Sequence, residues 1–593
     1  MPRRRAGARW LRTPPPDAAQ VRALEEVLHL PRALCELLVA RGLSGEAEAR
    51  RYLRPQLEQL HAPGLLKDMD VAVERLSRAI GAGERIMVHG DYDVDGMCST
   101  TLMTRALRAL GGEVTPFIPD RSTDGYDLGP AGVRAALDAG ARVVLTCDCG
   151  TSAHESVRVL QEAGVDVIIS DHHLPGGPLP NALAVLNPRR ADDTSPDKDL
   201  AAVGVAYKLA MELTRAMGGS ENVVLNMLDL VALATVADVA PLRGENRVFV
   251  RRGLPMITAS RSAGLRALVR AAGLDEKEMT AGRVGFILAP RLNALGRIGR
   301  ALDGVRLLLS DREDEGNQLA RQCEELNRER QELDRRILDE AMRRVAGLDL
   351  DDTWGLVLHG AGWHPGVIGI VASRVVEQTG RPAVLIAVQD GIGKGSGRSI
   401  PAFDLHAALQ VCDDLLMKHG GHKAAAGLTI DAGQLDAFTA RFNEVARAQL
   451  TLDDLVPEIR VDVALSLDDA NAAMEELLRH VEPCGMGNPG PVFSARGVRV
   501  VGGPDKIGSD GVKVRLATTT GPTEAVGWGL AHRAEELAAA RAGSVEIVFK
   551  LGRNEYRGAS TLQATLVDFR AEATPVDGRA EATPVDGRAE ATP

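Results

Sequence analysis

From about residue 70 to residue 250, short continuous apolar runs alternate with amphipathic segments. Segments such as Ala131–Ala139 and His154–Ala163 carry the apolar spacing of helices. The predicted strands are Arg85–His89, Glu113–Ile118, Arg142–Cys147 and Val165–Ser170. Continuous apolar runs are typical of a parallel sheet that is covered on both faces. We therefore predict an α/β domain with a parallel sheet over residues 61–300.

Residues 301–350 predict one long connector helix. Apolar side chains recur there at helical spacing, and oppositely charged side chains four residues apart occupy the other face. The apolar stripe, which we interpret as packing, consists of Leu319, Cys323, Leu326, Leu333, Ile337 and Ala341. A second α/β domain is predicted over 351–452, with strands at Trp354–His359 and Ala383–Val388 and a helix at Val367–Gln378.

The two ends of the chain differ from these domains. Residues 453–570 contain short apolar runs separated by Gly, Pro and Asp, which favour a small β-barrel like an OB-fold. Its predicted strands include Val498–Val501, Val512–Thr518 and Val545–Leu551. Residues 1–60 predict a basic tip followed by short helices. Residues 571–593 repeat Ala-Glu-Ala-Thr-Pro-Val-Asp-Gly-Arg with almost no large apolar side chains, which predicts a disordered tail.

Composition limits the class of protein. The chain has 593 residues, so several domains are expected, and its net charge of -11 argues against a protein that coats nucleic acid indiscriminately. Seven cysteines scattered over this length do not suggest a disulfide framework. No apolar run is long enough to span a bilayer, and no secretory signal is evident. We expect a cytoplasmic protein without membrane contact.

The most distinctive segment is His89-Gly90-Asp91-Tyr92-Asp93-Val94-Asp95-Gly96. It follows a predicted buried strand and precedes a predicted helix, with Asp95 or Gly96 near the helix N-cap. Such a turn lies where open α/β sheets bind ligands. One imidazole and three carboxylates within seven residues indicate a bound cation. The alternative is a solvated acidic turn in which Asp95 caps the helix.

Three other predicted elements also end in metal-ligand residues. Asp148 follows the third strand, Asp171-His172-His173 follows the fourth, and Asp238 ends an apolar helical stretch. Cys147 and Cys149 flank Asp148 and could suggest zinc, but neighbouring residues at a strand end point to opposite faces. Carboxylates with two or three imidazoles suit Mn²⁺ or Mg²⁺ better than a thiolate zinc site does.

These residues together resemble the DHH phosphoesterase superfamily, in which two metal ions lie side by side. The resemblance implies that His89, Asp93 and Asp148 hold one ion, and that Asp95, Asp148, His172 and Asp238 hold the other. Asp148, His172 and His173 would be the catalytic residues, with His173 binding either metal or substrate. The segment Cys147-Asp148-Cys149-Gly150 departs from the family pattern, because it carries a cysteine where a small or amide side chain is expected. This leaves the ligand intact and predicts sensitivity to oxidation.

Further motifs resemble the RecJ exonucleases within that superfamily. They are Pro290–Arg297, Trp363–Arg374, Gly393–Ser399, Gly420–Lys423 and Glu482–Pro489, the last of which resembles the segment that enters the RecJ OB-fold. Gly-rich loops beside Ser, Lys and Arg can form an anion nest from backbone N–H groups. The predicted phosphate or nucleic-acid contacts are Arg291, Asn293, Arg297, Ser373, Arg374, Lys394, Ser396, Arg398, His419, Gly421 and His422.

The resemblance implies a 5′→3′ exonuclease for single-stranded DNA in recombination and repair. Its expected cofactors are two divalent cations, Mn²⁺ before Mg²⁺. The expected partner is single-stranded DNA with a 5′ end, and single-strand-binding protein and a helicase are further candidates. The protein itself is expected to be a monomer. Two alternatives stay open: a phosphodiesterase for short oligonucleotides or cyclic dinucleotides, and a non-catalytic scaffold that binds DNA. Residue spacing alone does not fix the polarity.

Overall fold

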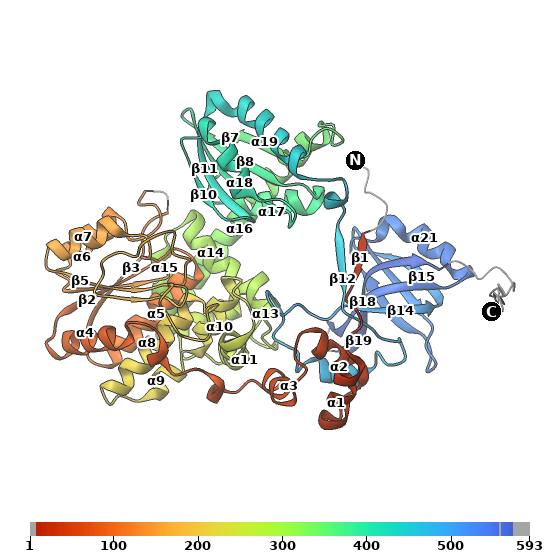
Figure 1. Cartoon of the computed structure of the whole chain (residues 1–593), viewed down its shortest axis with the longest axis horizontal. Coiled ribbons are helices and arrows are strands. Elements are labelled where there is room, and N and C mark those ends of the chain that lie inside the picture. Colours follow the sequence, from red (N-terminus) through yellow and green to blue (C-terminus); the bar gives the residue numbers. More distant parts are fainter. Residues whose placement is uncertain (1–7, 122, 557–558, 573–593) are drawn as a thin grey trace, which may run out of the picture. The chain divides into compact units, whose positions relative to one another are not determined.

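The computed structural model describes residues 8–121, 123–556 and 559–572, and the predicted basic tip at 1–7 and most of the repeat tail lie outside them. The chain forms two compact units (Figure 1). Unit 1 comprises Arg50–Pro457 and Val481–Pro489, and unit 2 comprises Ala8–Ala49, Glu458–His480 and the chain from Gly490. None of the helices in the described residues combines the length and apolar character of a membrane span.

The first α/β domain of unit 1 contains a five-stranded parallel sheet with the order β3-β2-β4-β5-β6. The four predicted strands are confirmed, and a fifth, β6, completes the edge. The strands are β2 (Arg85–Gly90), β3 (Glu113–Phe117), β4 (Val143–Cys147), β5 (Asp166–Ser170) and β6 (Ala184–Leu186). All five residues of β4 are buried, as expected from its uninterrupted apolar run.

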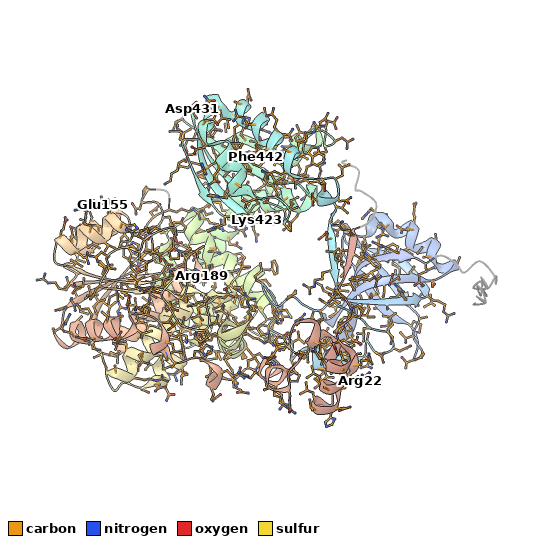
Figure 2. All side chains as sticks on the ribbon, in the orientation of Figure 1. Arg22, Glu155, Arg189, Lys423, Asp431 and Phe442 are labelled. Carbon is orange, nitrogen blue, oxygen red and sulfur yellow. The ribbon has the colours of Figure 1, made fainter. Side chains whose placement is uncertain are left out.

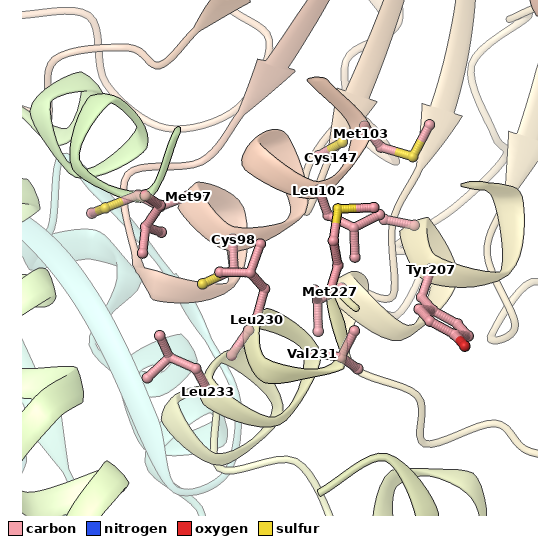
Figure 3. Packing of buried hydrophobic residues seen from close by; sticks show 14 of the residues in the cluster. Met97, Cys98, Leu102, Met103, Cys147, Tyr207, Met227, Leu230, Val231 and Leu233 are labelled. Atoms are coloured by element: carbon pink, nitrogen blue, oxygen red, sulfur yellow. The ribbon is translucent and has the colours of Figure 1, made fainter. Parts of the chain in front are cut away.

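Helices cover both faces of this sheet. α6 and α7 lie on one face, and α4 and α8 lie on the other, each side with its own cluster of buried apolar residues (Figure 1). α5 packs against α8 and α10 (Figure 3). The helices are α4 (Met69–Gly81), α5 (Val94–Ala109), α6 (Pro130–Asp138), α7 (His154–Glu162), α8 (Ala202–Ala216), α9 (Glu221–Leu225), α10 (Leu228–Ala237), α11 (Gly244–Thr258) and α12 (Ala263–Ala271), with short η1 (Leu57–Gln59) and η2 (Pro63–Leu65) before them.

The predicted single helix over 301–350 is wrong at its start. Ser310 and Arg312 have extended backbone angles and separate two helices, and three acidic residues then favour a new helix N-terminus. The long helix is nevertheless present, and its stripe is packing as predicted, because Cys323 joins the first core and Ile337 joins the second. The elements are α13 (Ala281–Arg283), η3 (Val284–Leu288), α14 (Ala289–Ile298), α15 (Ala301–Leu309) and α16 (Glu313–Ala346).

The second α/β domain of unit 1 has a mixed sheet of order β10-β11-β9-β8-β7. Its interior holds Phe442, whose ring contacts those of Phe403 and Phe438 (Figure 2). The strands are β7 (Leu356–Ala361), β8 (Ala383–Gln389), β9 (Ile392–Arg398), β10 (Lys418–Gly421) and β11 (Ala425–Asp431). The helices are α17 (Ile368–Thr379), α18 (Leu405–Val411), η4 (Asp413–Leu415), η5 (Ala432–Gln434) and α19 (Leu435–Gln449).

The predicted glycine-rich loop at 393–399 is wrong, because Ile392–Arg398 forms strand β9 between β8 and β11. Its backbone groups pair with both neighbours, so they cannot form an anion nest. The glycines serve packing instead. A Cβ atom on Gly393, Gly395 or Gly397 would approach a core side chain within 2.8 Å. The alternate residues Lys394, Ser396 and Arg398 share the opposite face of the strand.

Unit 2 contains a seven-stranded sheet of order β13-β14-β18-β19-β17-β16-β15, and β1 pairs with β12. The predicted strand at 498–501 is interrupted, because β14 ends at Val498 and β15 begins at Val500. The strands are β1 (Arg9–Arg12), β12 (Glu458–Val461), β13 (Val463–Ala464), β14 (Phe493–Val498), β15 (Val500–Ile507), β16 (Gly511–Leu516), β17 (Thr523–Gly527), β18 (Val545–Tyr556) and β19 (Ala559–Ala571). The helices of this unit are α1 (Ala18–Leu28), α2 (Arg32–Ala40), α20 (Ala472–Leu478), η7 (Ala531–Arg533), α21 (Ala534–Ala539) and η8 (Ala540–Ala542). α3 (Glu46–Leu53) begins in unit 2 and ends in unit 1, and η6 (Asp453–Leu455) belongs to unit 1.

The N-terminal strand is part of the packing of unit 2. β1 runs parallel to β12, and its buried Trp10 donates a hydrogen bond from Nε1 to Asp568 Oδ2 at 2.7 Å. The guanidinium of Arg570 lies 4.2 Å from the Trp10 ring centroid. Residues from both ends of the chain therefore stabilise the same unit.

We predict that Trp10→Ala destabilises unit 2 by about 3 kcal/mol, because it removes a buried indole and leaves Asp568 without that donor. Scanning calorimetry should show the transition of unit 2 lowered by roughly 8 °C. Leu11→Ala is the matched control, since Leu11 lies on the same strand but is exposed. Equal transitions for both variants would contradict this account of β1.

Candidate metal centre and phosphate site

The carboxyl ends of β2, β4 and β5 and the C-terminus of α10 bring most of the predicted metal ligands together. β2 and β4 are neighbours, with Gly90 paired to Cys147, so the turns after them meet. The strand order reverses between these two strands, which is where open α/β sheets bind ligands. The residues that meet there are Asp91, Asp93, Asp95, Asp148, His172, His173 and Asp238.

Within the described ranges, three groups of potential ligand atoms form there, and the atoms of each group lie within 4.8 Å of one another. Two groups share Asp148, and two share His172. The groups are Asp148/His172/His173, Asp95/His172/Asp238 and Asp91/Asp93/Asp148. A carboxylate shared between neighbouring groups rich in oxygen suits a pair of hard divalent cations. The residues present therefore fit a two-metal centre.

Asp148 and His172 face each other as two acceptors. Nδ1 of His172 lies 3.2 Å from the carbonyl oxygen of Leu200, which can only accept, so Nδ1 carries the proton. Burial, aided by the charge of His173, lowers the pKa of His172 to about 4 and keeps the ring neutral. Its bare Nε2 is 3.2 Å from Asp148 Oδ1, which accepts no hydrogen bond from the described residues. A cation bound by both atoms would relieve this contact.

Backbone groups orient these carboxylates. Asp148 has a left-handed φ of 65°, and its N–H donates to the carbonyl of Ser170. The predicted N-cap of α5 is off by two residues, because Asp93 is the cap and accepts from the N–H groups of Asp95 and Gly96. The carboxylate of Asp95 accepts from the N–H groups of Ala202 and Val203, which start α8, at 2.8 and 2.9 Å. Each side chain keeps further lone pairs for a cation.

The electrostatics of the centre favour a bound cation. Burial, reinforced by neighbouring carboxylates, raises the pKa values of Asp91, Asp148 and Asp238 well above their ordinary range. The same causes raise the pKa of Asp95 to about 7. Buried carboxylates are therefore costly to ionise here unless positive charge is added.

His173 is oriented by Asp171, whose Oδ1 lies 2.8 Å from His173 Nδ1. Burial lowers the pKa of His173, but the hydrogen bond and charge of Asp171 outweigh it and raise the pKa to about 9. Nδ1 is also 3.8 Å from Asp148 Oδ1, and Nε2 is 3.3 Å from the hydroxyl of Tyr126. His173 thus borders both the metal groups and the space next to them.

His89 is the predicted ligand that the structure does not bring into any of the three groups. Its ring is fully buried, with Nδ1 3.5 Å from Cys149 Sγ. Nε2 has no hydrogen-bond partner within the described part of the chain, and a Cβ atom on Gly132 would lie 2.6 Å from it. Its role as a ligand stays a prediction.

The two cysteines beside Asp148 are both buried. Cys147 lies in the core, whereas Cys149 contacts His89 instead of turning fully away from the site. Burial raises the pKa of both thiols. Thiolates, which bind zinc and react with oxidants, are therefore disfavoured, which argues against the predicted sensitivity to oxidation.

Asp91 is a candidate ligand that the sequence reasoning did not assign. It is 4% exposed, and its Oδ1 is without a hydrogen-bond partner among the described residues. The only available signal was its position in the same acidic turn, two residues before Asp93.

Four guanidinium groups gather beside the metal groups. Burial, together with the charges of Arg121, Arg330 and Arg398, lowers the pKa of Arg297 to about 10, and the charge of Asp93 partly opposes this shift. Arg297 therefore lies within electrostatic reach of both the arginines and a metal-group carboxylate. Mutually repelling cations that lie close together favour a bound anion. Arg121 and Arg330 were not predicted, since no local motif marks them.

The contacts of these arginines leave donors for an anion. Arg297 Nη1 donates to the carbonyl of Gly366 at 2.9 Å, and Arg398 Nη1 donates to Ser396 Oγ at 3.1 Å. Nε of Arg330 is buried and finds no acceptor in the described ranges. Arg374 instead lies 3.0 Å from Asp334.

The other predicted phosphate contacts are placed less favourably. Arg291 donates to both carboxylate oxygens of Glu324 and to the carbonyl of Ile287. The strand register puts His419 on the face of the sheet opposite Ser396, so the structure does not bring these two together. The remaining predicted positions are Asn293, half-buried on α14; Ser373, on α17; Lys394, exposed on β9; Gly421, exposed at the end of β10; and His422, exposed directly after β10.

Three family models match the chain. The DHH family N-terminal domain matches residues 85–235, the DHHA1 domain matches 352–448, and the RecJ OB domain matches 461–568. These ranges fall on the two α/β domains of unit 1 and on the β-sheet of unit 2.

Curated relatives and solved structures match most of the chain. The single-stranded-DNA-specific exonuclease RecJ of Bacillus subtilis is 36% identical over 93% of this chain and 70% of its own length, and that of Escherichia coli is 36% identical over 90% and 95%. A crystal structure of RecJ with Mn²⁺ from Thermus thermophilus superimposes with a TM-score of 0.81 at 34% identity, covering 96% of this chain and 81% of that one. The chain therefore belongs to the RecJ family of DHH proteins.

Proposed function

We propose that the protein is a metal-dependent exonuclease that degrades single-stranded DNA from the 5′ end and releases 5′-mononucleotides. The observation that carries the proposal is the contact between Asp148 and His172, two acceptors shared among three groups of ligand atoms. Such a centre suits two cations, and Mn²⁺ or Mg²⁺ matches its carboxylate and imidazole ligands. RecJ of Thermus thermophilus has been crystallised with each of these ions.

The metal centre would be held by Asp91, Asp93, Asp95, Asp148, His172 and Asp238, with His89 as a further candidate. When bound, two divalent cations supply an activated water and stabilise charge on the phosphoryl oxygens. The hydrogen bond from His172 Nδ1 to Leu200 fixes the ring so that Nε2 faces the centre. Asp171 orients His173, which we assign to the scissile phosphate.

The arginine cluster supports a 5′ specificity. A terminal phosphate carries more negative charge than an internal diester, and it suits several guanidinium groups at once. Arg297 lies within electrostatic reach of Asp93, so a terminal phosphate bound there would leave the next phosphodiester close to the metal ligands. We assign Arg121, Arg297, Arg330 and Arg398 to this phosphate.

Other surfaces fit a longer strand. On the second sheet of unit 1, Thr429 of β11 pairs with Lys394 of β9 on one side and with Lys418 of β10 on the other, and both lysines are exposed. The next row of paired residues on the same face contains Gly427 and Gly420. In unit 2, Trp528 is 60% exposed and can stack on a base, whereas Phe493 and Phe549 are buried in the core. A domain of this kind is unnecessary for dinucleotide substrates, so the long-strand reading is favoured. We further propose a cytoplasmic monomer that works with a helicase and single-strand-binding protein.

We predict that Asp148→Asn lowers the rate of single-strand hydrolysis by about a thousandfold or more, because the shared carboxylate is lost. In EDTA the variant should unfold at a higher temperature than the parent, since a buried repulsive carboxylate becomes neutral. Added Mn²⁺ should stabilise the parent more than the variant. The control is Glu155→Gln, an exposed residue on α7. Undiminished cleavage by Asp148→Asn would refute the assignment of Asp148 as a metal ligand. If the parent protein binds no Mn²⁺, the alternative of a non-catalytic scaffold that binds DNA would be favoured.

We predict that Arg398→Lys reduces the preference for strands with a 5′ phosphate over strands with a 5′ hydroxyl by about tenfold, because lysine lacks the planar fork. Digestion of strands labelled at either end, with and without the 5′ phosphate, provides the measurement. Arg336→Ala, an exposed arginine on α16, is the control and should keep the preference. Release of the 3′ label first would mean that the polarity is reversed.

A further inference from the structure

The segment Val481–Pro489 belongs to unit 1, although the residues on either side of it belong to unit 2. We call it the strap. Its motif was expected to lead into the OB-fold, and β14 of unit 2 does begin at Phe493, shortly after it. The structure also docks the segment against the turn that follows Asp238. This position gives the motif a role in the metal centre.

Arg247, a residue of α11, holds the strap by hydrogen bonds. Its side chain is buried, and it donates to the carbonyls of Val481, Glu482 and Pro483 at 3.0, 2.9 and 3.3 Å. Nε donates to the carbonyl of Tyr52 at 3.0 Å, and the guanidinium lies 4.0 Å from the Tyr52 ring centroid. One guanidinium therefore satisfies four carbonyls from two distant segments, and losing it would leave them without a shared donor.

Asn488 closes the strap on itself. Its side chain is 3% exposed, and Nδ2 donates to the carbonyls of Val481 and Pro483 at 2.9 and 2.7 Å. Its Oδ1 accepts a hydrogen bond from the hydroxyl of Tyr52 at 2.7 Å. The strap is thus a closed loop with a fixed conformation.

The strap packs against the residues just after Asp238. The N–H of Leu242 donates to the carbonyl of Met486 at 2.7 Å. A Cβ atom on Gly485 would lie 2.8 Å from Leu242 Cδ1, and one on Gly487 would lie 3.0 Å from Pro241 Cβ. The two glycines of the motif therefore permit a close approach that larger residues would prevent.

The turn held in this way is strained. Val239 directly follows Asp238 and has a φ of 58°, a left-handed conformation that is unfavourable for a β-branched residue. Such a residue persists only where its surroundings hold it in place. The strap supplies that support from the far side of Pro241 and Leu242.

We propose that the strap is a positioning element for Asp238, which it holds in reach of His172. Asp238 Oδ2 is 3.9 Å from His172 Nε2, and both atoms belong to one of the ligand groups. The inference rests on the two-metal centre of the proposed function. Asn488, Tyr52 and Arg247 are then positioning residues that act on the metal through the turn at 239–242.

The test is Mn²⁺ binding by the full-length protein, measured from the electron paramagnetic resonance signal of free Mn²⁺. We predict that Asn488→Ala raises the dissociation constant of one of the two Mn²⁺ ions by about tenfold, because loss of the contacts that support a metal ligand typically weakens binding by this amount. The dissociation constant of the other ion should stay nearly unchanged. Tyr52→Phe removes only the hydroxyl bonded to Asn488 and should shift the same ion less, in the same direction. This milder variant keeps the test valid if Asn488→Ala does not fold.

Asn443→Ala is the matched control. Asn443 likewise joins two segments, through hydrogen bonds with the N–H groups of Trp354 and Gly355 and the carbonyl of Asp352, but it lies in the second α/β domain. The Asn443→Ala variant should bind both Mn²⁺ ions with the same dissociation constants as the parent. One outcome would overturn only the role of the strap. In it, the parent binds two Mn²⁺ ions, and both Tyr52→Phe and folded Asn488→Ala bind them with the same affinities as the parent. A parent that binds no Mn²⁺ would overturn the proposed function and, with it, this inference.

Discussion

The candidate metal centre depends on one contact, between a buried carboxylate and an unprotonated imidazole nitrogen. Asp148 Oδ1 and His172 Nε2 are 3.2 Å apart, and both are acceptors when the Asp148 carboxyl is ionised. The ring proton lies on Nδ1, next to the carbonyl oxygen of Leu200, so the contact needs either a proton on Asp148 or a cation between the two atoms. The remaining carboxylates of the centre add more negative charge, so the arrangement is stable only with positive charge between them.

The sheet topology creates this contact. Because β2 and β4 are adjacent and the chain turns to opposite sides after them, the acidic turn after β2 meets Asp148 after β4. β5 lies next to β4 and brings His172, while α10 ends with Asp238 at the same edge. The first turn of α8 then binds Asp95 through two N–H groups. The ligands therefore come from four segments that lie far apart in the sequence.

The sequence predicted the elements with strong local signals and failed where packing decides. The buried strands of the first domain and the long helix were predictable, because continuous apolar runs and helical spacing are local features. β9 was mistaken for a loop, since glycine disfavours strands and only the core beneath it shows why glycine is needed at 393, 395 and 397. The pairing of Arg291 with Glu324 and the gathering of Arg121 and Arg330 around Arg297 are tertiary features without a local pattern.

The central claim is that Asp148 and His172 bind two cations side by side. The most direct measurement is anomalous diffraction at the manganese absorption edge from crystals soaked in Mn²⁺. The account predicts two anomalous peaks roughly 3.5–4 Å apart, with Asp148 bound to both and His172 bound to one. Peaks elsewhere, or no peak beside Asp148 at saturating Mn²⁺, would contradict it.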